Sequence, residues 1–333
     1  TRPMTGVSIV PSHHRHSLPR AMRIAAVALL AAGSMTSGCA KRAVTSRPQV
    51  GVTLLTEAHV FYQDLKRGMQ RAADSLDIDL HIVAGEWDLA RQTSQVENFI
   101  TQGMNAIVIA PVDSRGIVSA VEEANHARIP VFTADISAAG GDVTAHVASD
   151  NAQGGRLVGE FLARRLNGRG KVAILDQPTV TSVIDRVRGF REAMAAYPGI
   201  AIVAAPAVER GLREVAKQKT DNLLQSHRDL NAIFGSNDDC ALGALASIRA
   251  AGKTGIVIVG FDATPEAQAA IREATGLLAD AIQYPEVIGR RTIEAVARHL
   301  KGELVPRLIP IAVGLVTRDS LGAVPAAPAA PTH

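Results

Sequence analysis

The sequence predicts an α/β fold in which parallel sheets are flanked by helices. Short apolar runs rich in β-branched residues are typical of buried strands in a parallel sheet, and segments with helical spacing lie between them. Three of these runs stop at a carboxylate or carboxamide: 131–134 at Asp135, 232–236 at Asn237 and 256–261 at Asp262. Ligands of open α/β sheets bind at the carboxyl ends of the strands, so these three residues are candidates for a binding site.

The first half of the chain alternates between strand-like and helix-like segments. Its first helix is predicted from apolar residues spaced by three and four, which are Phe61, Leu65, Met69, Ala72 and Leu76. Two further amphipathic helices are predicted around 90–102 and 115–126. The predicted strands are 50–55, 80–84, 106–110, 130–134 and 145–148. This order predicts βαβ units with right-handed crossovers.

The same alternation then starts again, which predicts two similar lobes rather than one large sheet. The strands predicted for the second half are 171–175, 201–205, 232–235, 255–260 and 277–283, with helices between them. A last helix near 286–300 and a strand near 307–316 have no partner in a second lobe built this way. They are therefore expected to return to the first lobe.

Composition and charge argue against a nucleic-acid partner. The 333 residues are 47% hydrophobic and only 3% aromatic, and the formal net charge is +3. Four arginines and no acidic residue lie in residues 1–39, so the rest of the chain carries a net charge of −1. The folded part therefore has no overall bias towards phosphate.

Residues 1–39 have the pattern of a secretory signal peptide. Arg20 and Arg23 precede the apolar stretch 24–32, which is too short for a permanent membrane span. The segment 36–39 then resembles the lipobox of bacterial lipoproteins, in which the cysteine (here Cys39) is lipidated. Ordinary cleavage after this segment, with release into the periplasm, is the open alternative.

The motifs of catalysis and of cofactor binding are missing from the sequence. Gly252-Lys253-Thr254 looks like the end of a phosphate-binding loop, but Ser247 stands where that motif needs glycine, and the segment leads from helix into strand. No serine nucleophile motif and no metal-ligand spacing is present. The sequence therefore predicts no enzyme activity, no catalytic residue, no cofactor and no metal site.

Polar residues after a strand can also serve as helix caps. Thr264 stands before Pro265 and is the better cap for the next helix, which leaves Asp262 free. Asp238 is expected to cap the helix after the 232–236 run, which leaves Asn237 free. No helix follows Asp135 directly. All three are therefore predicted to bind a ligand.

Three motifs, in this order, give a family resemblance. Residues 146–151 (HVASDN), 237–244 (NDDCALGA) and 259–265 (VGFDATP) resemble the ribose-binding-protein family of periplasmic sugar receptors, and the similarity runs from about residue 50 to 318. The resemblance implies a type I periplasmic binding protein: two Rossmann-like lobes joined by a hinge of three crossings. A small carbohydrate would bind between the lobes, and the closed form would be presented to an ABC permease in the inner membrane.

The resemblance also implies a set of ligand-binding residues and a division into lobes. The ligand-binding residues are His59, Phe61, Tyr62, Asp135, Asn237, Asp262 and Gln283. An aromatic face can cover the apolar side of a sugar ring, while carboxylates and amides take its hydroxyls. Phe61 fits equally well in the apolar stripe of its helix, and Trp87 is expected to be a surface or lobe-packing residue, since nothing in the sequence places it at the site. The segments are a leader (1–39), a linker (40–48), an N-terminal lobe (49–149 and 284–312), a C-terminal lobe (150–283 and 313–320) and a disordered Ala/Pro tail (321–333).

Several positions depart from the ribose-binding pattern. Ile136 and Ile184 stand where that family carries arginines, and Ala110, Gly211 and His59 replace two asparagines and an aromatic residue. Arg186 matches a more structural arginine of the family. The pocket is therefore expected to be less polar than a ribose site, which favours a deoxy sugar, a less hydroxylated ring or a cyclic polyol over ribose.

The interpretation favoured is a monomeric, extracytoplasmic solute-binding protein of an ABC importer that closes about its hinge on a small carbohydrate. A sensor module that signals to a membrane receptor is the alternative with the same fold. A carbohydrate-processing enzyme would need paired carboxylates, for which Asp135 and Asp262 are the candidates. A transcription repressor with this fold is rejected, because an export leader stands where a DNA-binding segment would be.

Overall fold

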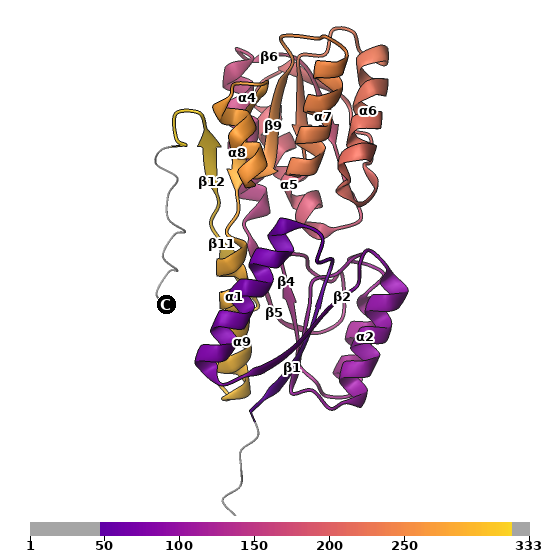
Figure 1. Cartoon of the computed structure of the whole chain (residues 1–333), viewed down its shortest axis with the longest axis vertical. Helices are drawn as coiled ribbons and strands as arrows, with labels where there is room; N and C mark the ends of the chain where they lie inside the picture. Colours follow the sequence, from indigo (N-terminus) through magenta and orange to yellow (C-terminus); the bar gives the residue numbers. More distant parts are fainter. Residues whose placement is uncertain (1–46, 322–333) are drawn as a thin grey trace, which may run out of the picture. The chain divides into compact units, whose positions relative to one another are not determined.

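The computed structural model of the protein describes residues 47–321. The predicted leader with Cys39, most of the linker and nearly all of the Ala/Pro tail lie outside these residues. The described part contains two six-stranded sheets, each covered by helices on both faces (Figure 1). Within it, no helix combines the length and the hydropathy that a membrane span needs.

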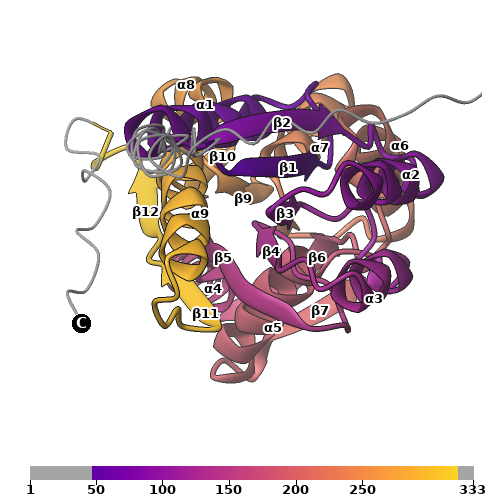
Figure 2. The ribbon, with the colours of Figure 1, turned by 90° about the horizontal axis from the view of Figure 1, so that it is seen from below.

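The first lobe is built on a fully parallel sheet with the order β11-β5-β4-β3-β1-β2. Its strands are β1 (Gln49–Leu54), β2 (Asp79–Ala84), β3 (Ala106–Ile109), β4 (Val131–Ala134), β5 (Val143–Ser149) and β11 (Leu308–Ile311). Its helices are α1 (Val60–Leu76), α2 (Leu89–Thr101), α3 (Val118–His126) and α9 (Pro285–Leu300). Helices α1 and α9 lie side by side on one face, and α2 and α3 cover the other (Figure 2).

The second lobe repeats this plan, with the sheet order β12-β10-β9-β8-β6-β7. Its strands are β6 (Arg169–Leu175), β7 (Gly199–Ala204), β8 (Ala232–Gly235), β9 (Val257–Asp262), β10 (Leu277–Ile282) and β12 (Gly314–Thr317). Its helices are α4 (Asn151–Arg165), α5 (Thr181–Ala195), α6 (Arg213–Ser226), α7 (Asp238–Ala250) and α8 (Pro265–Arg272), with a 3-10 turn at Glu209–Gly211. Only β12 runs antiparallel to its neighbour in this sheet.

The chain passes from one sheet to the other three times: after β5, after β10 and between β11 and β12. The predicted class of two parallel α/β lobes is therefore confirmed. We propose lobe boundaries after residues 149, 283 and 312. The single strand predicted near 307–316 is wrong, because two strands in different sheets occupy it. Between them Val313 N donates to the side chain of Gln153 at 3.3 Å.

Close helix packing in the second lobe fixes the position of a helix that reaches the site. A Cβ atom at Gly155 of α4 would lie 2.0 Å from the backbone oxygen of Arg186 in α5, and one at Gly189 of α5 would lie 2.0 Å from that of Ala152. Glycine at both contact points lets the two backbones approach closely. The rest of α5 is anchored by buried apolar residues such as Phe190, so Arg186 projects from a rigid element.

Candidate functional site

A cavity of about 150 Å³ lies between the two lobes and is lined by residues from both. All seven residues predicted to bind a ligand are among those that line it, although their role in binding remains a prediction. These are His59, Phe61, Tyr62, Asp135, Asn237, Asp262 and Gln283. They converge because parallel strands of each sheet end at the same edge, and the two edges face each other across the cavity.

The wall from the first lobe centres on a buried carboxylate. The hydroxyl of Tyr62 donates to Asp135 Oδ2 at 2.8 Å, while Asp135 Oδ1 is buried and has no hydrogen-bond donor among residues 47–321. Burial raises the pKa of Asp135 to about 6, although the charge of Arg186 and the Tyr62 hydrogen bond act in the opposite direction. Such an oxygen, desolvated but unpaired, is suited to accept a hydrogen bond from a ligand hydroxyl.

The wall from the second lobe is organised around a buried guanidinium. Arg186 donates to the side chain of Asn151 at 2.8 Å and to the backbone oxygen of Ser236 at 2.9 Å, and its Nη1 lies 3.4 Å from Asp262 Oδ1. Its guanidinium carbon lies 4.0 Å from the ring centroid of Phe261, in cation–π contact. The side chains of Arg186 and Asp262 are only 6% and 7% exposed, so this ion pair is screened from solvent.

Gln283 completes that wall. Its Nε2 donates to Asp262 Oδ1 at 2.6 Å, while its Oε1 is buried and has no partner in the described part of the chain. The cavity therefore offers a second unpaired acceptor besides Asp135 Oδ1. Between these polar groups lie apolar side chains, including Leu55, Ile136 and Val183. Unpaired acceptors set in apolar walls fit a small ligand that has both hydroxyl groups and C–H surface.

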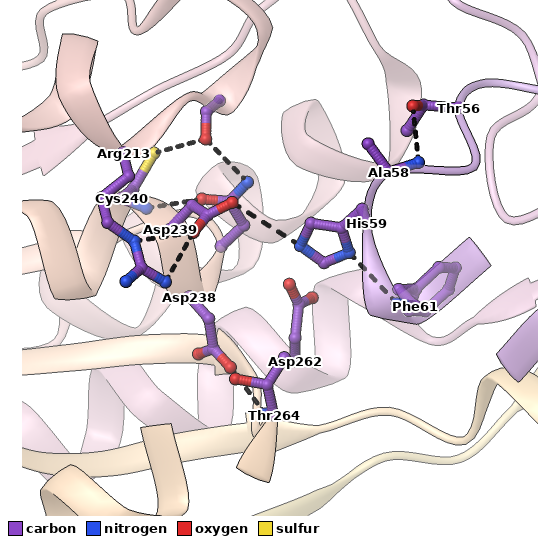
Figure 3. A network of polar contacts seen from close by, with 12 residues as sticks. Thr56, Ala58, His59, Phe61, Arg213, Asp238, Asp239, Cys240, Asp262 and Thr264 are labelled. Carbon is purple, nitrogen blue, oxygen red and sulfur yellow. Dashed lines mark hydrogen bonds and ion pairs between the residues drawn. The ribbon is translucent and has the colours of Figure 1, made fainter. Parts of the chain in front are cut away.

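His59 links the two lobes at the edge of the cavity (Figure 3). Its Nδ1 accepts from the backbone N–H of Phe61 at 3.2 Å and caps α1. Its Nε2 lies 3.9 Å from Asp239 of α7 in the other lobe, and Asp239 is paired with Arg213 at 2.9 Å. Because Nδ1 accepts a hydrogen bond, the neutral ring carries its proton on Nε2, which points towards Asp239.

The predicted capping is correct for one helix and wrong for another. Thr264 caps α8, as expected, and leaves Asp262 free for the cavity. However, Asn237 and not Asp238 caps α7: Asn237 Oδ1 accepts from the backbone N–H of Cys240 at 2.8 Å. The backbone of Asn237 is extended, as an N-cap residue requires. Its Nδ2 donates to the backbone oxygen of Gly211 at 3.2 Å, so both of its polar atoms already have partners.

Trp87, expected to be a surface or lobe-packing residue, packs against the core and also lines the cavity. Both Glu86 and Trp87 adopt positive φ angles, 50° and 62°. The Glu86 carboxylate accepts from the Thr56 hydroxyl at 2.7 Å and from the Glu57 backbone N–H at 2.9 Å. These bonds hold the loop after β2 against the loop after β1, and this tertiary contact carries Trp87 to the cavity.

The cavity lining also includes two arginines that were not predicted as site residues, Arg186 and Arg210. Three of the positions that depart from the ribose-binding pattern line the cavity: His59, Ile136 and Gly211. The other two do not, since Ile184 is 44% exposed and Ala110 is buried in the core. The apolar replacement at Ile136 thus falls within the cavity, but the guanidinium of Arg186 keeps the opposite wall polar.

Gly211→Ala is expected to weaken ligand binding at least tenfold. Gly211 has a φ of +61°, and a Cβ there would lie 2.6 Å from Asn237 Nδ2 and 2.7 Å from Gln177 Oε1, so both side chains would have to move. The matched control is Gly252→Ala, which has a φ of +62° but no atom within 4 Å of the new Cβ. Both variants should lose about 1–2 kcal/mol of stability from the left-handed backbone. Equal affinities for the two variants in calorimetry would contradict the role of Gly211.

Comparisons with known proteins agree with this geometry. The profile of the family described as Periplasmic binding protein domain matches residues 50–304. The ribose import binding protein RbsB of Salmonella typhimurium is 33% identical over 302 residues, which cover 90% of this chain and all of that protein. Two of the solved structures similar to this chain are ABC transporter solute-binding proteins. That of Bacillus halodurans C-125 with bound myo-inositol has a TM-score of 0.77 at 28% identity, over 83% of this chain and 96% of the other. That of Actinobacillus succinogenes 130z with bound D-allose has a TM-score of 0.75 at 27% identity, over 83% and 99%.

Proposed function

Because the chain belongs to the periplasmic binding protein domain family, we propose that it is the extracytoplasmic solute-binding protein of an ABC importer and holds a small carbohydrate between its lobes. The observation that carries the proposal is a pair of buried, unpaired acceptors, Asp135 Oδ1 and Gln283 Oε1, on opposite walls of one cavity. A sugar or polyol hydroxyl could donate to each of them at once, and each new bond would remove a desolvation cost that the empty protein carries.

The predicted ligand is a neutral sugar, deoxy sugar or polyol. Solute-binding proteins similar to this chain have been solved with myo-inositol and with D-allose. Ile136 presents a hydrocarbon surface next to Asp135, which suits a ring or polyol with fewer hydroxyls than ribose presents. A few hydrogen bonds to charged groups, worth about 1.5–3 kcal/mol each, less the cost of ordering ligand and lobes, give about −8 kcal/mol, or micromolar affinity.

Calorimetric titration of residues 47–333 with D-ribose, D-allose, L-arabinose, xylitol and myo-inositol tests the proposal. At least one compound is expected to bind with a dissociation constant of about 1 μM or lower. The fluorescence of Trp87, the one tryptophan of the sequence, gives a second reading because it lines the cavity. No heat and no fluorescence change with any of these compounds, in a protein with cooperative unfolding, would count against a carbohydrate ligand.

Closure of the lobes is supported by a set of hydroxyl contacts outside the cavity lining. The Thr181 hydroxyl at the start of α5 accepts from Ser137 N at 2.9 Å and lies 3.0 Å from Ser137 Oγ. The backbone N–H of Thr181 donates to Ser114 Oγ at 3.1 Å, and Ser114 N donates to the backbone oxygen of Thr179 at 3.2 Å. Ser114 and Ser137 belong to the first lobe and Thr179 and Thr181 to the second, so these bonds exist only while the lobes are together.

Thr181→Val is therefore expected to weaken carbohydrate binding by about 3- to 10-fold, because each lost hydrogen bond favours the open form by about 0.5–1.5 kcal/mol. The matched control is Thr220→Val, whose buried hydroxyl bonds only within α6, to Ala216 O at 2.8 Å. Calorimetry should show weaker binding for the first variant alone, and X-ray scattering should show a larger open fraction at equal ligand concentration. Unchanged affinity of Thr181→Val would contradict the closing role.

The proposed location is the periplasm, with an anchor through a lipid on Cys39, and the proposed partner is an ABC permease that docks the closed monomer. The leader and Cys39 lie outside the residues that the structure describes. The acyl anchor is proposed on the lipobox-like segment 36–39 alone.

A further inference from the structure

Two carboxyl groups are buried side by side beneath the second-lobe wall of the cavity. Asp238 lies in the first turn of α7 and is 2% exposed, and Asp280 lies in β10 and is fully buried. Each has one oxygen with a donor: Asp238 Oδ2 accepts from Thr264 N at 2.6 Å and Asp280 Oδ1 accepts from Ala263 N at 3.1 Å. Among residues 47–321 the other oxygens, Asp238 Oδ1 and Asp280 Oδ2, are buried and have no donor, and the bonds to the consecutive residues Ala263 and Thr264 bring the two carboxyl groups side by side.

A proton between these groups would supply the missing donor. Two adjacent carboxylates in a protein interior cannot both be ionised, since their repulsion adds to the cost of burying each charge. Within residues 47–321 neither group forms an ion pair. The negative charge of Asp262, which is itself paired with Arg186, acts on both buried groups. One proton shared as Asp–COOH···⁻OOC–Asp would give a hydrogen-bond partner to both unpaired oxygens and leave the pair with a single negative charge.

The two backbone N–H groups that the pair holds belong to the turn that presents Asp262. Asp262 has a φ of 118° and Ala263 a φ of 54°, both in the left-handed region that residues other than glycine rarely adopt. Such a conformation is strained and persists only where its surroundings enforce it. Gly260 leaves room for the pair, since a Cβ there would lie 2.5 Å from Asp280 Oδ2.

We propose that Asp238 and Asp280 are positioning residues that share one proton and, through the bonds to Ala263 and Thr264, hold the strained turn that aims Asp262 into the cavity. Figure 3 shows the Asp238–Thr264 contact next to Asp262. The inference rests on the proposed function for its effect on ligand binding, but the shared proton itself is a property of the ligand-free protein. Removal of that proton leaves two facing charges and loosens the turn, so affinity for the ligand falls at alkaline pH.

The shared proton is tested directly by NMR of ligand-free protein labelled with ¹³C at the aspartate carboxyl carbons. Burial raises the pKa of both groups, and the charge of Asp238 raises that of Asp280 further. At pH 7 the pair is expected to show the shifts of one acid and one carboxylate, with the second deprotonation only in the alkaline range. The spectra of Asp238→Asn and Asp280→Asn assign the signals. Two ionised carboxylates at pH 7 would overturn the proposal whether or not the protein binds a sugar.

The effect on binding is tested with D-allose, myo-inositol and xylitol as probes, from pH 6 to pH 10. Asp280→Ala removes the acceptor for Ala263 N and leaves Asp238 without its partner, and it is expected to weaken binding at least tenfold. In Asp280→Asn, the amide can accept from Ala263 N and donate to Asp238 Oδ1, so it should restore most of that loss and abolish the alkaline decline. Asp221→Asn is the control, since Asp221 is a partly exposed carboxylate of the same lobe that pairs with Lys217 and accepts from Ser247, and an amide oxygen can accept from both.

The outcomes separate the two ideas. An alkaline decline in wild type and Asp221→Asn that is absent in Asp280→Asn supports the positioning role. An Asp280→Asn profile that follows wild type overturns it. If wild type binds none of the probes, the proposed function fails and the shared proton is still decided by the NMR experiment.

Discussion

Asp262→Ala is expected to abolish measurable carbohydrate binding and to lower the free energy of unfolding by about 3–5 kcal/mol. Asp262 Oδ1 receives both the guanidinium of Arg186 at 3.4 Å and the amide of Gln283 at 2.6 Å. Without the carboxylate, a buried guanidinium loses its counter-charge, and removing one partner of a buried pair costs more than the pair contributes. The ligand loses a charged hydrogen-bond acceptor. The side chain of Gln283 loses the hydrogen bond that holds its Oε1 in position.

Calorimetry and urea unfolding of the same preparations separate the two effects. Asp185→Asn is the matched control, because Asp185 lies one residue before Arg186 and forms a surface pair with Arg188. Exposed ion pairs contribute little, so this variant should behave as wild type in both measurements. Asp262→Asn should keep the bond to Gln283 and recover part of the stability but little of the affinity. Full affinity in Asp262→Ala would rule out this residue as a ligand contact.

The course of the backbone could be predicted because it depends on local patterns. Buried strands of this chain are apolar runs of ordinary length, and every strand predicted before residue 300 is present, with ends that move by two residues or fewer. Parallel pairing then brings the residues after β4, β8 and β9 to the sheet edges, which is why Asp135, Asn237 and Asp262 line one cavity. The run near 307–316 was the exception, since nothing local in its sequence marks where the chain leaves one sheet for the other.

The site residues that were missed depend on contacts between distant segments. Trp87 reaches the cavity because Glu86 bonds to a loop thirty residues earlier in the chain. Arg186 could be recognised as an arginine of the family, but its partners come from α4, from the end of β8 and from β9, and no spacing in the sequence shows that they converge. Asn237 caps α7, whereas the carboxylate of Asp238 accepts from the backbone N–H of Thr264, a contact with a distant segment that no local pattern marks.

Asp135→Asn is expected to stabilise the ligand-free protein while it weakens carbohydrate binding. Burial raises the pKa of Asp135 from 3.8 to about 6. Between these pH values the folded protein binds more protons than the unfolded chain, so stability falls as pH rises through this window. Above pH 6 the full cost of burying the charge is present, about 3 kcal/mol at most. An amide avoids that cost, keeps an acceptor for the Tyr62 hydroxyl, and suits the positive φ of this position, 65°.

The same shift predicts the pH dependence of binding. The ionised Oδ1 is the better acceptor for a ligand hydroxyl, so wild-type affinity should decline below pH 6, by up to about tenfold per pH unit. Asp135→Asn should bind at least tenfold more weakly at pH 7 and show no such decline. Urea unfolding at pH 5 and pH 7 measures the first effect, since the gain in stability from the substitution should be larger at pH 7. A gain that is equal at both pH values, or a variant less stable than wild type at pH 7, would contradict this interpretation. It would show that the buried charge of Asp135 does not destabilise the ligand-free protein, and that Oδ1 has a partner other than the ligand.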